Sequence, residues 1–373
     1  MNQSLKDAMA GAFGKEVADK VEAKSKVKAN AGNFFEDFFV GMQIVHATPK
    51  TVTEGDVALY TGLTGSRYAL FSADRFAQDC GLESAPIDPL LAFHVIFGKT
   101  VTDISLNAVA NLGYADGMFV APVYPGDTLR SVSEVIGIKE NSNGKTGVVY
   151  VRTSGVNQND ELVLTYVRWV MVKKRDLDAP APEAVIPELP ANVDAENLVA
   201  PMMDAEDWDY ELAGSPHAYE DYTIGEKIDH YDAFTVEEAE HQIATRLYQN
   251  TAKVHFNQHE QAQGRFGKRL VYGGVAISMA RSIAFNGLAN AAQILAINAG
   301  AHANPLFAGD TVYAWSEVID KADISQGFGA LRLRLVATKN LPCTDFPYKD
   351  EDGKYLENVI LDFDYWTAIP KRG

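Results

Sequence analysis

Hydrophobic residues are distributed along the chain in patterns that predict both helices and strands. Pro89–Val101 and Gly274–Leu288 are mostly apolar on every side, which is typical of helices buried in a core. Two segments with more polar residues, Thr53–Thr61 and Val236–Tyr248, precede them and fit further helices. In Gly329–Thr338, leucine alternates with arginine, and this period of two predicts a half-buried strand.

The chain contains one internal repeat. Glu36–Gly41 (EDFFVG) returns as Glu220–Gly225 (EDYTIG), at an offset of 184 in the numbering. Pro122–Thr128 returns as Pro305–Thr311, and both end in Gly-Asp-Thr. Several matches in the same order at a nearly constant offset indicate an internal duplication. Each copy is therefore expected to carry the same elements.

A buried helix followed by several strands, found twice, predicts an α+β fold with two lobes. In each lobe a curved antiparallel sheet would wrap the helix, and the two sheets would meet edge to edge. Glu161–Val172, rich in Val and Tyr, predicts a longer strand, and the loop Leu341–Asn358 fits the extra length of the second copy. The predicted division is a tail over 1–32, a first copy over 33–175, a Pro-rich acidic linker over 176–216 and a second copy over 217–373.

The charge balance excludes some classes of function. The chain of 373 residues has a formal net charge of −17, which argues against a nucleic-acid-binding protein. Cys80 and Cys343 are the only cysteines, so a reducing compartment is favoured. The N-terminal segment lacks the features of a signal or transit peptide, and no apolar run is long enough to cross a membrane. We therefore expect a cytoplasmic protein, with a possible amphipathic helix over Lys6–Lys28.

The two copies differ in polar residues just before the buried helix. The second copy reads QNTAKVHF over 249–256, and the first copy reads GSRYALFS over 65–72. His255 therefore corresponds to Phe71, and Asn250 corresponds to Ser66. This difference indicates a functional site that only the second copy retains.

This stretch resembles the motif of the MaoC-like hydratase family, the R-specific enoyl-CoA hydratases with a hot-dog fold. Their motif is Gly-Asp-x-Asn-Pro-aliphatic-His, and Val254 and His255 match its last two positions. Blocks over 33–38, 121–128, 249–257 and 265–274 resemble the mesaconyl-CoA hydratase branch of that family. The resemblance covers nearly the whole chain outside the N-terminal tail.

The resemblance implies a tandem, or double, hot-dog fold and a hydro-lyase. The expected reaction is the reversible hydration of mesaconyl-CoA to 2-methylmalyl-CoA, on a CoA thioester, without cofactor or metal. It also implies a homo-oligomer, with a homodimer favoured, and no nucleic-acid or membrane partner. A hot-dog thioesterase and a non-catalytic CoA-binding protein remain alternatives, because the fold alone does not select the chemistry.

The implied reaction needs an oxyanion donor and a base. Adding water to an enoyl thioester builds negative charge on the thioester oxygen, which backbone N–H groups at a helix N-terminus can stabilise. Tyr272 and Gly273 open the second buried helix, so the Gly273 N–H is the expected donor. The glycine can equally serve close packing. His255 is the expected general base, with a buried structural histidine as the alternative.

Asn250 departs from the family motif, which has an acid at this position. An amide cannot accept a proton from water. Either His255 makes both proton transfers, or Asp88 or Glu238 stands in, or the substrate's own carboxylate takes part. Asn250 and the preceding Gln249 nevertheless remain candidate site residues.

The anionic parts of the substrate require cations. Arg67 and Lys253, which lie in the aligned loops, are candidates for binding the acyl carboxylate. Arg265, Lys268 and Arg269 form a basic cluster that could bind the CoA phosphates. Each of these side chains could instead be a solvated surface charge. The spacing of His255 and His259 does not match a metal-binding motif, and His94 is expected to be a core residue.

Overall fold

The computed structural model describes residues 28–325 and 327–372. Residues 33–373 form one compact unit, distinct from residues 1–32. The helix expected over Lys6–Lys28 lies almost entirely outside the described residues. Within the described residues, no helix is long and apolar enough to cross a membrane.

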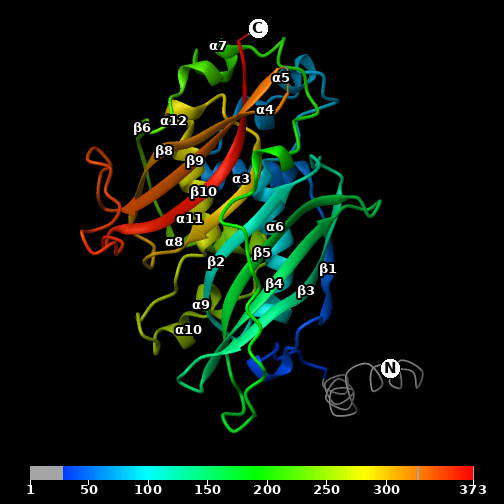
Figure 1. Ribbon diagram of the computed structural model, residues 1–373, viewed down its shortest axis with the longest axis vertical. Helices are drawn as coiled ribbons and strands as arrows, with labels where there is room; N and C mark the ends of the chain where they lie inside the picture. Colours follow the sequence, from blue (N-terminus) through cyan, green and yellow to red (C-terminus); the bar gives the residue numbers. More distant parts are fainter. Residues whose placement is uncertain (1–27, 326, 373) are drawn as a thin grey trace. The chain divides into compact units, whose positions relative to one another are not determined.

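A single ten-stranded sheet forms the frame of the unit (Figure 1). Its order is β1-β3-β4-β5-β2-β7-β10-β9-β8-β6, and the paired strands are antiparallel. The strands of the first half are β1 (Gln43–Thr51), β2 (Ala108–Phe119), β3 (Thr128–Glu140), β4 (Thr146–Val156) and β5 (Leu162–Lys173). Those of the second half are β6 (Lys227–Thr235), β7 (Ile294–Ala301), β8 (Thr311–Asp323), β9 (Phe328–Lys339) and β10 (Val359–Pro370). The halves join where β2 pairs with β7.

Each half of the sheet has a central helix, α6 (Pro89–Thr100) or α11 (Gly273–Ile283), and an outer helix, α3 (Glu54–Thr64) or α8 (Glu238–Leu247). The shorter helices are α4 (Ala69–Ser72), α5 (Asp74–Asp79), α7 (Tyr210–Ala213), α9 (Lys253–Phe256), α10 (Gln258–Gln261) and α12 (Phe285–Leu288). The remaining turns are η1 (Phe35–Asp37), the π-helical η2 (Val101–Ser105), η3 (Ala195–Asn197) and η4 (Tyr219–Asp221).

The hydrophobic pattern explains where the central helices lie. Every residue of α6 is buried, as expected for a segment that is apolar on all sides. His94 on this helix is fully buried, which confirms that it is a core residue. In β9 the predicted alternation is also confirmed: Leu333 is buried, whereas its neighbour Arg332 reaches Asp364 on β10. The double hot-dog arrangement is thus confirmed in its sheet and in its helices.

The internal repeat is visible as an approximate twofold relation between the halves. His94 of α6 and Ser278 of α11 occupy equivalent positions, and they meet in the core. The distance from His94 Nε2 to Ser278 Oγ is 2.8 Å, and the Tyr60 hydroxyl donates to the same Ser278 oxygen. The two central helices therefore pack against each other close to the approximate twofold axis between the halves. The domain boundaries assigned to the two copies remain a prediction.

Two segments without a counterpart complete the unit. The linker predicted over 176–216 contacts the second lobe through Val193, whose carbonyl accepts a hydrogen bond from the Trp366 indole. The loop Leu341–Asn358 lies between β9 and β10, as its Pro and Gly residues indicated. Its residues Phe346 and Tyr348 pack against Trp315. The linker therefore reaches β10, and the loop packs on β8.

Candidate active site

The N-terminus of α11 is left open to a ligand by the residues that form it. Tyr272 is the N-cap residue, and its side chain makes no capping hydrogen bond. A Cβ on Gly273 would lie 2.4 Å from Cε1 of His302, so this position requires glycine. The first N–H groups of a helix have no partner within it and carry a partial positive charge. This terminus can therefore stabilise an oxyanion, while its glycine also allows the close packing.

His255 lies in the short helix α9, close to this terminus. Its Nδ1 is 2.8 Å from the Leu270 carbonyl oxygen, so Nδ1 carries the proton and Nε2 keeps its lone pair. The imidazole packs edge-on against Tyr272, with ring centroids 5.6 Å apart. Burial, with smaller effects of His241 and His302, lowers the pKa of His255 to about 4. The ring is therefore neutral near pH 7 and able to accept a proton.

Asn250 is buried between α8 and α9, with 1 % of its surface exposed. Its side-chain oxygen accepts a hydrogen bond from the Ala252 N–H at 3.0 Å. This contact fixes the orientation of the amide, because only the oxygen can accept. The NH₂ group is then the part of Asn250 that can bind a substrate atom.

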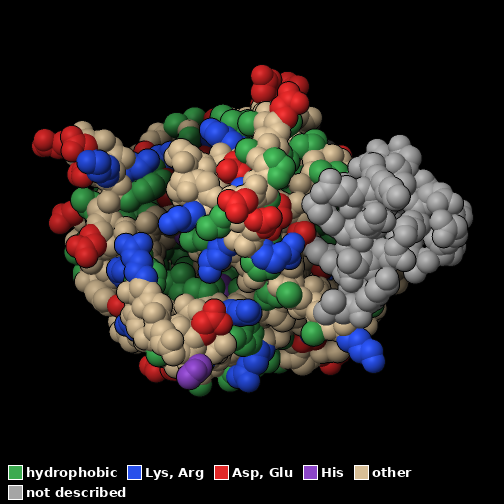
Figure 2. All heavy atoms as spheres, turned by 90° about the horizontal axis from the view of Figure 1, so that it is seen from below, with side chains coloured by type: hydrophobic (Ala, Val, Ile, Leu, Met, Phe, Trp, Pro, Cys, Tyr) green, Lys and Arg blue, Asp and Glu red, His purple; other side chains and the backbone are tan. Residues whose placement is uncertain are grey.

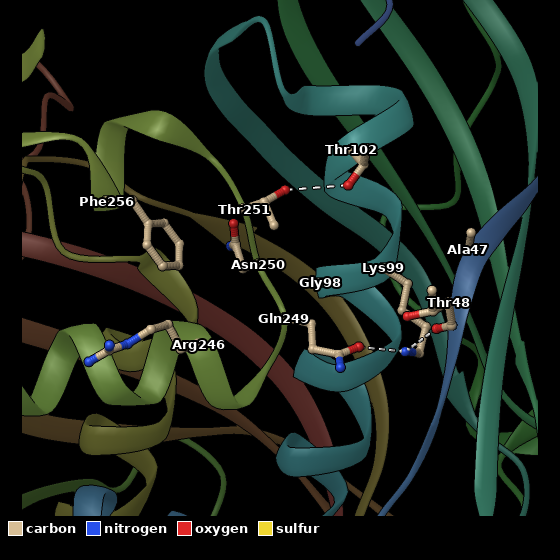
Figure 3. Close-up of a pocket in the computed structure, with 10 residues that line it drawn as sticks. All are labelled: Ala47, Thr48, Gly98, Lys99, Thr102, Arg246, Gln249, Asn250, Thr251 and Phe256. Atoms are coloured by element: carbon tan, nitrogen blue, oxygen red, sulfur yellow. Dashed lines mark hydrogen bonds between the residues drawn. The ribbon is translucent and has the colours of Figure 1, made fainter. Parts of the chain in front are cut away.

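Asn250 lines a pocket of about 430 Å³ between the two lobes' helices. The pocket is lined by Ala47, Thr48, Gly98, Lys99, Thr102, Arg246, Gln249, Asn250, Thr251 and Phe256 (Figure 3). Lys99 and Thr102 come from α6 and the turn after it, whereas Arg246 and Phe256 come from α8 and α9. The lining includes two cations and no carboxylate, so it favours an anionic ligand.

The equivalent place in the first lobe has neither the histidine nor the open helix terminus. Phe71 stands where the second lobe has His255. Asp88 accepts hydrogen bonds from the Leu90 N–H and the Ser66 hydroxyl, and burial raises the Asp88 pKa to about 6. Pro89, which has no N–H, is the first residue of α6. The N-terminus of α6 is therefore already capped.

Comparison with known proteins identifies the family. The family model described as mesaconyl-CoA hydratase matches residues 11–340. A β-methylmalyl-CoA dehydratase of Chloroflexus aurantiacus is 62 % identical over 93 % of this chain and 99 % of its own length. The chain belongs to the mesaconyl-CoA hydratase family. A mesaconyl-CoA hydratase of Cereibacter sphaeroides is 60 % identical over 92 % of this chain and 100 % of its own length.

Solved structures agree with the double hot-dog fold of this mesaconyl-CoA hydratase family member. A MaoC domain protein dehydratase from Chloroflexus aurantiacus superposes with a TM-score of 0.91, at 62 % identity, over 93 % of this chain and 100 % of that one. A protein of Mycobacterium tuberculosis described as a double hot-dog fold superposes with a TM-score of 0.72, at 25 % identity, over 91 % and 98 % of the two chains. The predicted fold class is therefore confirmed.

Of the expected site residues, the structure brings Gln249 and Asn250 to the lining of the pocket of this family member, whereas His255, Tyr272 and Gly273 are not part of that lining. Arg67 contacts Asp232 at 3.4 Å and stacks over Phe285, just beyond the C-terminal end of α11 and thus away from Gly273. Lys253 is exposed at the start of α9. Neither residue lines the pocket. Their expected contact with the acyl carboxylate stays a prediction that this placement does not support.

The two carboxylates considered as substitutes for the family's acid also lie elsewhere. Asp88 caps α6 in the first lobe, as described above. Glu238 pairs with Arg269 on the surface, and 57 % of its side chain is exposed. Asp88 is engaged at the N-terminus of α6 and Glu238 is engaged with Arg269, whereas His255 packs against Tyr272 at the N-terminus of α11, so the placement favours His255 as the group that handles protons.

The basic cluster after α10 lies on the surface near the site. Arg265 and Lys268 are exposed and stack over Phe266 and Phe307, respectively. Arg269 is half-buried and engaged with Glu238. Figure 2 shows Lys and Arg side chains around a hollow with apolar side chains on the end of the molecule seen from below. Binding of the CoA phosphates by this cluster stays a prediction.

The sequence reasoning missed Lys99 and Arg246, the two cations of the pocket. Lys99 carried a usable signal, because it is the only charged residue within an otherwise apolar, buried helix. Arg246 carried no such signal, since it resembles any polar residue on the outer helix α8. His302 was also missed, and its contact with Gly273 depends on β7, which no local pattern places there.

Proposed function

We propose that this chain catalyses the reversible hydration of mesaconyl-CoA to 2-methylmalyl-CoA. The names of the two curated relatives given above describe the two directions of this reaction. One observation of the site carries the proposal: the neutral His255 lies beside the open N-terminus of α11. The same lobe supplies the base and the oxyanion donor.

The hydration step follows from these two groups. The thioester oxygen accepts a hydrogen bond from the Gly273 N–H. His255 Nε2 removes a proton from water, and the water oxygen bonds to the alkene carbon β to the thioester. The π electrons move toward the thioester oxygen and form an enolate, which the helix terminus stabilises. The backbone dipoles at the N-terminus of α11 are oriented before the reaction, and they stabilise the negative charge that develops on the thioester oxygen.

The second proton transfer completes the addition. The enolate takes a proton at the carbon next to the thioester, and the imidazolium of His255 is the donor. Asn250 cannot exchange protons, so its NH₂ group orients the water or the substrate. Dehydration runs through the same groups in reverse. A single histidine thus carries the proton from the attacking water to the carbon next to the thioester.

An assay with mesaconyl-CoA tests the proposal. Loss of the conjugated double bond and release of CoA thiol are followed in parallel. Hydration is expected to remove the ultraviolet absorbance of the enoyl thioester without releasing thiol. Thiol release at the same rate as substrate loss would instead indicate a thioesterase, and no change in either signal would indicate a protein that only binds CoA esters.

Other properties remain predictions from the sequence. A homo-oligomer, with a homodimer favoured, can be checked by light scattering on the full chain. The cytoplasmic location can be checked by fractionation of the source cells.

A further inference from the structure

We propose that Lys99 is the residue that recognises the free carboxylate of the acyl group and so makes the site specific for a dicarboxylic acyl-CoA. This inference rests on the proposed hydration of mesaconyl-CoA at the same site. It replaces Arg67 and Lys253 by a cation that the structure places in the pocket.

The ammonium group of Lys99 is buried without a carboxylate partner. The residue is 2 % exposed, and its Nζ donates to the Thr48 carbonyl oxygen at 2.5 Å and to Gln249 Oε1 at 3.0 Å (Figure 3). None of the ion pairs found in the described residues includes Lys99. The cation is therefore held only by neutral oxygens, although burying a charge is costly unless an opposite charge accompanies it.

The surroundings of Lys99 increase the need for an anion. Burial and the neighbouring Lys50 lower the Lys99 pKa to about 8. The carboxylate of Asp56 pairs with Lys50 at 2.7 Å and is therefore not a partner of Lys99. A bound carboxylate would offset both the desolvation and the repulsion. The third hydrogen of the ammonium group is available for it.

The pocket beside Lys99 is built for an acceptor. The Asn250 NH₂ group is a donor, since its oxygen is bound to the Ala252 N–H. Arg246 adds a second cation, and it is exposed at the edge of the pocket. With no carboxylate in the lining, an anion meets donors and no like charge. The volume of about 430 Å³ leaves room for a short acyl group.

The two lobes provide an internal comparison. At equivalent positions, Lys99 corresponds to Ile283 and Arg246 corresponds to Gly62. These two cations therefore accompany the lobe interface that retains His255. The interface that has Phe71 lacks both of them, and its own cation Arg67 is already paired with Asp232 at 3.4 Å. The two cations and the base His255 thus occur at the same interface, as expected if one substrate contacts all three.

Two other buried cations do not share this pattern. Arg168 stacks over Phe97, and Arg281 stacks over Tyr68 and Tyr365. Arg168 and Tyr365 occupy equivalent positions, as do Phe97 and Arg281, so each lobe buries one arginine against an aromatic ring. Neither arginine lines the pocket. Their occurrence in both lobes indicates a role in packing.

Binding to an inactive background tests the role of Lys99. In His255→Ala protein, which should turn over either ligand about 10²- to 10⁴-fold more slowly, the dissociation constants of mesaconyl-CoA and crotonyl-CoA are measured by calorimetry. Crotonyl-CoA is an enoyl thioester without the free carboxylate. Adding Lys99→Met should weaken mesaconyl-CoA binding about 10- to 100-fold, the effect of losing a charged hydrogen bond. Crotonyl-CoA binding should change little.

Lys174→Met is the matched control, because Lys174 is a buried lysine that already pairs with Glu140 at 2.9 Å. It should leave the ratio of the two dissociation constants unchanged. If Lys99→Met does not fold, Lys99→Gln, which removes the charge but keeps a donor, carries the same test. An equal loss for both ligands, or no loss for either, overturns the role of Lys99. Failure of the wild-type protein to hydrate mesaconyl-CoA would overturn the proposed function itself, whatever the binding result.

Discussion

The N-terminus of α6 in the first lobe and that of α11 in the second lobe are equivalent in the fold but opposite in chemistry. In α6 the Asp88 side chain binds the Leu90 N–H, and Pro89 contributes no N–H. In α11 the Tyr272 side chain makes no capping bond, and Gly273 keeps its N–H. The first lobe gains a stable helix end, whereas the second retains an unsatisfied terminus beside a base. On the proposed function, the duplication separates stability from catalysis.

The largest expected effect comes from the base. His255→Ala should reduce the turnover of mesaconyl-CoA about 10²- to 10⁴-fold, because it removes the group that takes the proton from water. The mirror change, Phe71→His, should leave turnover near the wild-type value, since the adjoining helix end is capped. Steady-state kinetics with both variants checks this. Activity of Phe71→His/His255→Ala near the wild-type level would show that the two lobes are interchangeable.

A second change tests the open helix end. Gly273→Ala places a Cβ 2.4 Å from the His302 ring, which shifts the terminus that holds the thioester oxygen. The loss in kcat should be about 10²-fold, as for removal of an oxyanion donor. Asp88→Ala at the equivalent end should cost about 1 kcal/mol of stability through the lost cap, with kcat retained. Equal losses of kcat in the two variants would contradict the division between lobes.

Much of this comparison could be predicted from the sequence. The repeat, the buried helices and the substitution of His255 by Phe71 are local patterns, so the double fold follows from them, as does the proposal that the second lobe carries the base. The insertion at Leu341–Asn358 was also found, because Pro and Gly mark loops.

The cations of the pocket could not be found in this way. Arg67 lies in the aligned loop, but this loop packs beside Phe285 after the C-terminal end of α11, so alignment alone placed Arg67 near the wrong helix end. Lys99 reaches Gln249 from the other copy, 150 residues away along the chain. Only the packing of α6 against the second lobe brings these two residues together.

A smaller effect is expected at Asn250. Asn250→Asp keeps an oxygen for the Ala252 N–H but replaces the donor by a negative charge. Affinity for mesaconyl-CoA should fall about tenfold through repulsion of the carboxylate, while crotonyl-CoA should be tolerated better. The KM values for the two substrates check this. Faster mesaconyl-CoA hydration without a change in preference would mean that the amide is only a weakened acid.

The smallest effect concerns pH. The folded pKa of His255 is lowered to about 4 by burial, below the ordinary value of 6.5. The basic form is therefore present at neutral pH, and activity should be lost only as the pH falls through about 4. The acid limb of kcat/KM measures this pKa in the free enzyme. A limb near 6.5 would place His255 in a more solvated position than the structure shows.

The stoichiometry of substrate binding tests the difference between the lobes most directly. Calorimetric titration of His255→Ala protein with mesaconyl-CoA should give one site per chain, because the equivalent place beside Phe71 has a capped helix end and no counterpart of Lys99 or Arg246. Two equivalent sites per chain would contradict this account.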